Sequence, residues 1–125
     1  MKKHILITDD EPLILLGLAE ALQSESIHID TATTATKAVE MIAGSQYDLY
    51  ILDLTLPDMN GFELAQKIRD CHPKAKFIFM SGKYRDLQDM LQNSAKAAAL
   101  NPTAFITKPF DFAQAHDIVC RSLVS

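Results

Sequence analysis

The sequence predicts an α/β fold in which a doubly wound, parallel sheet of five strands is covered by helices on both faces. Two observations lead to this prediction. Short apolar runs alternate along the chain with longer segments whose apolar residues recur at helical spacing. Most of the short runs are apolar on successive residues, which is typical of strands that are buried on both faces of a parallel sheet. Strands that alternate with helices imply right-handed βαβ units.

The first half of the chain contains three of the apolar runs. Pro12 suits the first turn of a helix, and Gly44 is a natural helix end. Leu13, Leu16, Ala19 and Leu22 recur at the spacing of a helix. The expected strands span residues 4–8, 27–32 and 48–53, and the expected helices span residues 11–22 and 35–44.

The second half of the chain continues the alternation. Phe62, Ala65 and Ile68 lie on one face of a predicted helix that begins after an Asn60-Gly61 turn signal. An alanine-rich stretch is interpreted as one long helix at residues 86–100. The remaining expected elements are strands at residues 76–80 and 104–107 and helices at residues 61–70 and 111–123.

Length, charge and cysteine use limit the class of protein. A chain of 125 residues fits one compact domain, which we expect to span residues 1–125. Its net charge of −4 gives no footprint for direct nucleic-acid binding. No apolar stretch is long enough to cross a membrane, and acids interrupt any signal peptide after "MKKH". Cys71 and Cys120 lie far apart and are expected to be free thiols of a cytoplasmic protein.

Polar side chains follow four of the five expected strands. Ligands of open α/β sheets bind outside the carboxyl ends of the strands, so these side chains should meet at one edge. Each alone has an ordinary explanation as a helix cap, a turn residue, a loop serine or a solvated lysine. Their conjunction favours a site. They are Asp9, Asp10 and Glu11 after the first strand, Asp53 at the end of the third, Ser81 after the fourth and Lys108 after the fifth.

A cluster of carboxylates at one edge attracts a hard cation. Mg²⁺ fits, because it accepts one or two carboxylates and keeps waters and phosphate oxygens as its other ligands. One carboxylate can then attack phosphorus and become an acyl phosphate. The phosphoryl oxygens need a fixed cation and a hydroxyl donor, for which Lys108 and Ser81 are candidates. The sequence therefore predicts a magnesium-dependent phosphoryl-transfer site.

With these residues the sequence resembles the receiver domain of bacterial two-component response regulators, over essentially the whole chain. The resemblance is carried in order by "ILITDDEP" (5–12), "DLYILDLTLPDMNGFEL" (48–64), "FIFMSG" (77–82) and "FITKPF" (105–110). It implies a (βα)5 flavodoxin-like receiver fold. It also implies a switch, rather than an enzyme that turns over a substrate, which accepts a phosphoryl group from a sensor histidine kinase or a histidine phosphotransfer protein. Output would pass to an effector domain C-terminal to this segment or to a partner protein.

The resemblance implies roles for three acids of the predicted site and for Thr55. Asp53 falls at the phosphoacceptor position. Asp9 and Asp10 fall at the acidic pair that holds Mg²⁺ together with Asp53. The backbone carbonyl of Thr55, two residues beyond Asp53, would be a further metal ligand.

Three further residues match the positions that respond to phosphorylation. Ser81 matches the switch hydroxyl that moves to meet the phosphoryl group, and Lys108 matches the lysine that pairs with that group. Phe105 matches an aromatic switch position, although a core residue of the last strand is an equally good interpretation.

Two segments depart from the pattern that the resemblance implies. Ser81 and Lys108 are 27 positions apart, a few more than is usual, so the fourth helix or its loops are expected to be extended. "NPTAF" (101–105) replaces the usual turn of glycine-alanine type before the last strand. Both departures put a standard output surface in doubt and leave the site residues unaffected.

Three rival functions use some of the same features. A phosphohydrolase with an aspartyl nucleophile usually needs a second acid two residues later, and here that residue is Thr55. A flavin-binding module is disfavoured because the acidic loop "DDEP" (9–12) would repel a phosphate. A degenerate receiver that works only by protein contact is disfavoured because Asp53, the acidic pair and Lys108 are all present.

Overall fold

The structure is a computed structural model that describes residues 2–124 of the 125-residue chain. Five parallel strands form one sheet of order β2-β1-β3-β4-β5. The strands are β1 (Lys3–Thr8), β2 (Ile27–Ala32), β3 (Leu49–Asp53), β4 (Phe77–Ser81) and β5 (Ala104–Thr107). The helices are α1 (Pro12–Leu22), α2 (Ala35–Gly44), α3 (Gly61–Cys71), α4 (Leu87–Asn93), α5 (Ala95–Leu100) and α6 (Phe112–Leu123). This confirms the predicted parallel α/β sheet.

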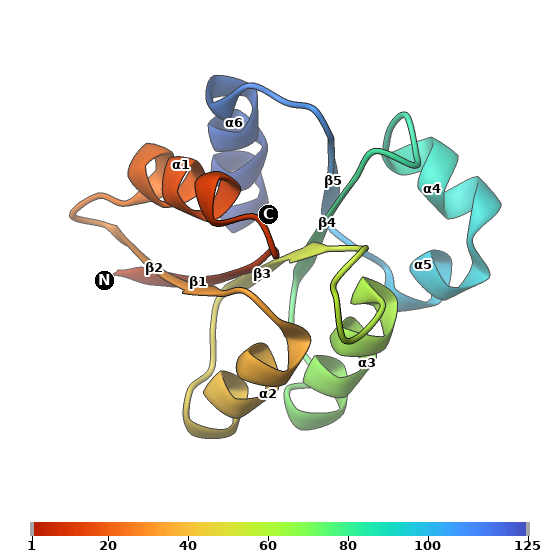
Figure 1. Cartoon of the computed structure of the whole chain (residues 1–125), viewed down its shortest axis with the longest axis horizontal. Coiled ribbons are helices and arrows are strands. Elements are labelled where there is room, and N and C mark those ends of the chain that lie inside the picture. Colours follow the sequence, from red (N-terminus) through yellow and green to blue (C-terminus); the bar gives the residue numbers. More distant parts are fainter. Residues whose placement is uncertain (1, 125) are drawn as a thin grey trace.

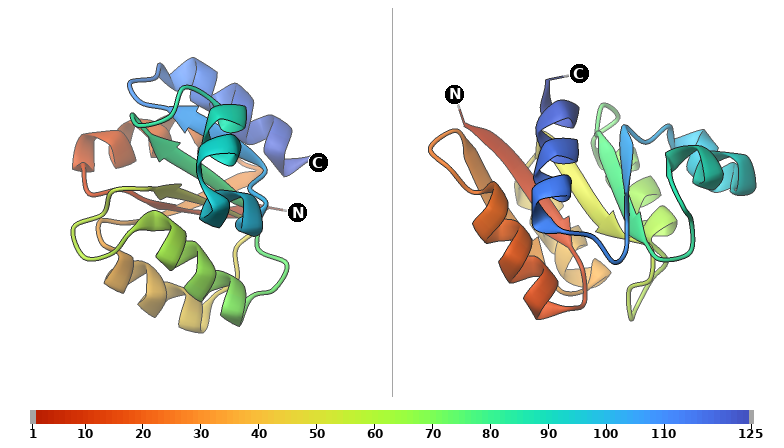
Figure 2. Two further views of the ribbon diagram at one scale, coloured as in Figure 1. Left: turned by 90° about the vertical axis from the view of Figure 1, so that its right-hand side faces the viewer. Right: turned by 90° about the horizontal axis from the view of Figure 1, so that it is seen from above.

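The sheet separates two apolar cores. Helices α1 and α6 cover one face, and α2 and α3 cover the other, with α4 and α5 beyond the β5 edge (Figure 1). The left view of Figure 2 shows the resulting layers of helix, sheet and helix. Every residue of β3 and β4 is buried, which matches the continuously apolar runs that precede Asp53 and Ser81 at the strand ends. The central strand β3 is therefore a rigid support for the acid at its end.

Helix α1 buries only part of its apolar surface. Leu15, Leu18 and Leu22 are buried, whereas Leu13 and Leu16 are 80% and 57% exposed. The segment "PLILLGLAEAL" is apolar around most of its circumference, so periodicity alone could not select the buried face.

The prediction of a single helix at residues 86–100 was wrong, because this segment forms two short helices, α4 and α5. The break lies at Ser94, whose hydroxyl accepts a hydrogen bond from the N–H of Ala97 at 3.1 Å and caps α5. Asp86 caps α4 in the same way by accepting from the N–H of Asp89 at 2.8 Å. The extra residues between Ser81 and Lys108 thus form a second helix turn rather than a longer α4.

Helix α5 is fastened to α3 by an arginine. Nη2 of Arg69 donates to the carbonyl oxygens of Ala75 at 2.9 Å and Leu100 at 3.0 Å. Its guanidinium also lies 4.7 Å from the centre of the Phe77 ring. Helix α5 is therefore anchored at its C-terminal end to the face of the sheet that α3 covers. Within residues 2–124, no helix has the length and apolar character needed to cross a bilayer.

Candidate functional site at the carboxyl edge of the sheet

The carboxyl ends of β1 and β3 bring together the acids that the sequence singled out. Asp9 is fully buried and Asp53 is 5% exposed, whereas Asp10 is exposed. Each of the three offers one carboxylate oxygen, and these oxygens all lie within 4.8 Å of one another. Backbone groups fix two of the carboxylates: Glu11 N–H donates to Asp9 Oδ1 at 2.9 Å and Thr55 N–H donates to Asp53 Oδ1 at 3.2 Å.

Lys108 extends from the end of β5 into the same cluster. Its Nζ lies 2.6 Å from Asp9 Oδ2, 3.4 Å from Asp53 Oδ2 and 3.8 Å from Glu11 Oε1. Backbone pairing of Lys108 N–H with the Ser81 carbonyl at 2.9 Å holds the end of β5 against the end of β4. The peptide bond between Lys108 and Pro109 is cis. The Lys108 ammonium therefore forms ion pairs with the two buried carboxylates and also lies close to the carboxylate of Glu11.

Burial and mutual repulsion shape the electrostatics of the cluster. Burial raises the pKa of Asp53, the N–H of Thr55 opposes that effect, and the charge of Asp9 adds to it. For Lys108, burial alone would lower the pKa, but the hydrogen bond and charge of Asp9, followed by those of Asp53, raise it overall. The negative charge at this edge is only partly compensated by protein groups.

The donor set fits a hard divalent cation. Three carboxylates that converge on one point repel one another when ionised, and a cation relieves that repulsion. Asp9, Asp10 and Asp53 are the residues that could hold such a cation. Thr55 is exposed and lies two residues after Asp53. The assignment of its backbone carbonyl as a further metal ligand stays a prediction.

The loop after Asp53 is tightly closed. Thr55 and Asn60 form an isolated antiparallel bridge, and Gly61 N–H donates to the Leu54 carbonyl at 3.0 Å. A Cβ atom at Gly61 would lie 2.5 Å from the carbonyl oxygen of Asp53 and 2.8 Å from Cα of Leu54. Glycine is needed here because the start of α3 passes directly against the backbone of the candidate phosphoacceptor.

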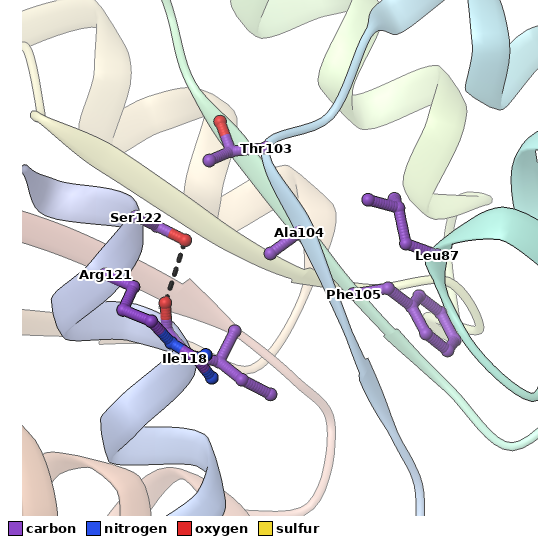
Figure 3. A pocket seen from close by; sticks show the side chains of 7 residues that line it. All are labelled: Leu87, Thr103, Ala104, Phe105, Ile118, Arg121 and Ser122. Atoms are coloured by element: carbon purple, nitrogen blue, oxygen red, sulfur yellow. Dashed lines mark hydrogen bonds between the residues drawn. The ribbon is translucent and has the colours of Figure 1, made fainter. Parts of the chain in front are cut away.

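Ser81 lies at the carboxyl end of β4, and Phe105 lies within the neighbouring edge strand β5. Ser81 is buried at the end of β4, and its hydroxyl accepts a hydrogen bond from Lys83 N–H at 2.9 Å. Phe105 is 7% exposed and packs edge-to-face against Tyr84, with ring centres 6.2 Å apart. In Figure 3 the Phe105 ring and Leu87 lie together on one side of β5. Phe105 is therefore a core residue of β5 in this structure.

A groove beside Phe105 runs between β5 and two helices. Figure 3 shows that β5 separates the Phe105 ring from side chains of α6, where the Ser122 hydroxyl donates to the Ile118 carbonyl at 2.9 Å. The side chains that line the groove are Leu87, Thr103, Ala104, Phe105, Ile118, Arg121 and Ser122. Any movement of Phe105 would change the shape of this surface.

Two residues near the site were not singled out from the sequence. Tyr84 is 8% exposed and covers Phe105, but a tyrosine in a loop carries no local signal of that contact. Asp58 lies in the loop after Asp53 and bonds to the start of α2. Its partners are 22 and 23 residues away, so no local sequence pattern signals the contact.

Comparison with known proteins identifies the family. A family model described as "Response regulator receiver domain" matches residues 5–120. The sporulation initiation phosphotransferase F of Bacillus subtilis (strain 168) is 31% identical over 123 residues, which are 98% of this chain and 95% of that protein. The DNA-binding transcriptional regulator NtrC of Azospirillum brasilense is 32% identical over 97% of this chain, which spans only 24% of that protein.

Solved structures agree with the sequence relatives. The response regulator receiver domain protein (CheY-like) from Methanospirillum hungatei JF-1 has a TM-score of 0.86 at 29% identity, covering 99% of this chain and 95% of that one. The chain therefore belongs to the response regulator receiver domain family. Its function is that of a receiver in two-component phosphorelay signal transduction.

Proposed function

We propose that Asp53 is the phosphoacceptor of this receiver and that residues 1–125 act as one receiver domain. The observation that carries the proposal is the setting of the Asp53 carboxylate. It lies at the carboxyl end of a fully buried strand, within 4.8 Å of two other acid groups and 3.4 Å from the Lys108 ammonium. A nucleophile held on a strand end is kept in position for an incoming phosphorus atom.

The transfer takes a phosphoryl group from a phosphohistidine of a histidine kinase or histidine phosphotransfer protein. A carboxylate oxygen of Asp53 forms a bond to phosphorus while the bond between phosphorus and the imidazole nitrogen breaks. The electron pair of that bond stays on the imidazole, which is thereby regenerated. Lys108 then neutralises phosphoryl oxygens, because its ammonium already lies beside both Asp9 and Asp53.

Asp9, Asp10 and Asp53, with the carbonyl of Thr55, would hold Mg²⁺ at this edge. The bound ion supplies charge neutralisation for the phosphoryl oxygens. Support for the ligand set comes from the convergence of the three carboxylates and from the pKa of Asp53, which burial raises in the protein alone. A cation is the partner that this partly compensated cluster needs.

Ser81 and Phe105 carry the response in this proposal. The Ser81 hydroxyl accepts from Lys83 N–H, so its own proton is available for a phosphoryl oxygen after a small rotation. Displacement of the loop that follows Ser81 moves Tyr84, against which the Phe105 ring packs. A two-state shift of this pair would alter the groove between β5 and α6.

The phosphodonor is expected to contact α1. Leu13 and Leu16 are exposed on the helix that begins three residues after Asp9, and Pro109 and Phe110 line the neighbouring surface next to Lys108. An apolar patch beside a charged reaction centre suits a protein donor better than a small phosphate ester. The domain is thus a switch that takes part in its own phosphorylation rather than an enzyme that turns over a substrate, and a cytoplasmic location follows from that role.

Incubation with acetyl phosphate or phosphoramidate and Mg²⁺, followed by intact-mass measurement, tests the proposal. The wild-type protein is expected to gain one phosphoryl group, and Asp53→Asn is expected to gain none. Chelation of Mg²⁺ should abolish the gain in the wild type. Equal modification of wild type and Asp53→Asn, or none in the wild type with either these donors or a phosphorylated histidine phosphotransfer protein, would contradict it.

A further inference from the structure

Helix α2 receives much of its N-terminal cap from a distant loop. The carboxylate of Asp58 accepts hydrogen bonds from the N–H groups of Ala35 at 3.0 Å and Thr36 at 2.8 Å, and from the Thr36 hydroxyl at 2.6 Å. A local cap is also present, since the Thr34 hydroxyl accepts from Lys37 N–H at 3.1 Å. No acid lies in the first turn of α2 itself. Asp58 thus supplies the negative charge that the start of a helix favours.

The loop that carries Asp58 is the same loop that leaves the candidate phosphoacceptor. Thr55 N–H donates to Asp53 Oδ1, and the bridge between Thr55 and Asn60 closes the base of the loop. The Asp58 carboxylate holds the opposite part of the loop to α2. The backbone around Thr55 is therefore fixed from two sides, by the site and by the helix.

We propose that Asp58 is a positioning residue for the metal site, because it docks loop 54–60 on α2 and so sets the orientation of the Thr55 carbonyl. The inference rests on the proposed function, in which Asp53 and Thr55 hold Mg²⁺. A charged acceptor with three donors is stronger than a neutral cap, which makes this contact an effective restraint on the loop.

The docking contact is populated across the physiological pH range. The side-chain hydrogen bond of Thr36, followed by the backbone hydrogen bonds of Thr36 and Ala35, lowers the pKa of Asp58 to about 2. The carboxylate is therefore ionised wherever the receiver works, and the contact does not depend on pH near neutrality.

Coupling between two sites is reciprocal. If docking at α2 favours metal binding at Thr55, then metal binding stabilises the docked cap by the same factor. The first turn of α2 would consequently respond to the state of the site. This response would reach the face of the sheet that α2 covers, independently of Ser81 and Phe105.

Mg²⁺ titration by calorimetry, with the metal alone as the probe, tests whether docking of Asp58 strengthens Mg²⁺ binding. Asp58→Ala is expected to raise the dissociation constant at least about fivefold, and Thr36→Ala, which removes one of the three bonds, is expected to raise it less. Asp48→Ala is the matched control. Asp48 is also an exposed aspartate that accepts a backbone N–H, from His4 at 2.8 Å, but it precedes β3 at the amino end of the sheet.

Amide hydrogen exchange gives a readout that a purely structural cap would not move. In the wild type, Mg²⁺ is expected to slow exchange at the N–H groups of Ala35 and Thr36, and in Asp58→Ala this slowing should disappear. Asp58→Asn, which retains one oxygen acceptor, carries the test if Asp58→Ala does not fold.

Two outcomes would overturn the positioning role. One is a folded Asp58 variant whose Mg²⁺ affinity lies within twofold of the wild type. The other is exchange at Ala35 and Thr36 that does not respond to Mg²⁺ in the wild type. If wild-type Asp53 accepts a phosphoryl group and these results are still obtained, only the role of Asp58 fails. If the wild type binds no Mg²⁺, the proposed function fails with it.

Discussion

Two acidic regions of this molecule, a single aspartate on β2 and the cluster at the carboxyl edge of the sheet, differ in how many carboxylates converge. Away from the site, Asp30 on β2 accepts from the Tyr47 hydroxyl at 2.7 Å and lies 2.9 Å from His28 Nε2. At the carboxyl edge, Asp9 and Asp53 are more deeply buried and share the ammonium of Lys108. Each oxygen of Asp30 has a polar partner, and so has each oxygen of Asp9 and Asp53. At the edge, however, three carboxylates converge beside one ammonium, and this crowding of negative charge distinguishes the site.

The largest expected effect in this contrast comes from Lys108→Ala. Removal of the ammonium leaves two buried carboxylates without a counter-ion, and the free energy of unfolding in the absence of metal should fall by about 3 kcal/mol. Urea denaturation with chelator measures this change, and added Mg²⁺ should recover part of the loss. Lys37→Ala is the control, because its 3.9 Å pair with Glu40 is exposed and should change stability by less than about 0.5 kcal/mol. Equal effects of the two substitutions would contradict the contrast.

A smaller effect is expected at Asp30 on β2. Tyr47→Phe removes the hydroxyl that donates to Asp30, and it should lower the free energy of unfolding by about 1 kcal/mol. Because the hydrogen-bond partners of Asp30 are His28 and Tyr47 and not site residues, Mg²⁺ affinity and phosphorylation of Asp53 should stay unchanged. Denaturation and intact-mass measurements on one preparation check both statements. A loss of phosphorylation in folded Tyr47→Phe would mean that the two acidic regions are not independent.

The smallest differences are expected in pH dependence, where sign matters more than size. Burial raises the pKa of Asp53 above its ordinary value of 3.8, so ionisation of this carboxyl group opposes folding. The contribution of Asp53 to stability is therefore fully present below pH 3.8. It is lost as the pH rises through the raised pKa. Metal-free Asp53→Asn should therefore be more stable than wild type at neutral pH, and this advantage should vanish in acid.

Asp58 provides the comparison of opposite sign. Its pKa is lowered to about 2 from 3.8, so its contribution is present above pH 3.8 and is lost as pH falls toward 2. Asp58→Asn should be less stable than wild type at neutral pH. Chemical denaturation of the three proteins over a pH series measures both curves. Curves of the same sign for the two variants would show that burial does not control Asp53.

Much of the architecture and of the candidate site could be predicted because the signals are local and repeated. The runs that became β3 and β4 are apolar at every position before the terminal Asp53 and Ser81, and their burial on both faces of the sheet matches that pattern. Since parallel strands end at one edge, residues that follow different strands had to meet there. Asp9, Asp53 and Lys108 do meet, although they are far apart in the sequence.

The features that sequence reasoning missed depend on competition or on distant partners. Residues 86–100 have high helix propensity, but Ser94 forms a local cap that competes with continuation of the helix. Helix α1 is apolar on too many sides for its buried face to be chosen by period. The bonds of Asp58 to α2 join segments that only the finished fold brings together. Such contacts have no signature in a window of neighbouring residues.

Gly61 has a consequence for how this receiver tolerates mutation. The residue has no functional group, binds nothing and lies eight positions after Asp53, yet any side chain there would meet the Asp53 carbonyl at 2.5 Å. Inherited changes that silence the domain can therefore arise at a position outside its chemistry. A ranking of positions by the reactivity of their side chains would miss Gly61. A ranking by the space around each backbone atom would give Gly61 the same importance as the acids of the site.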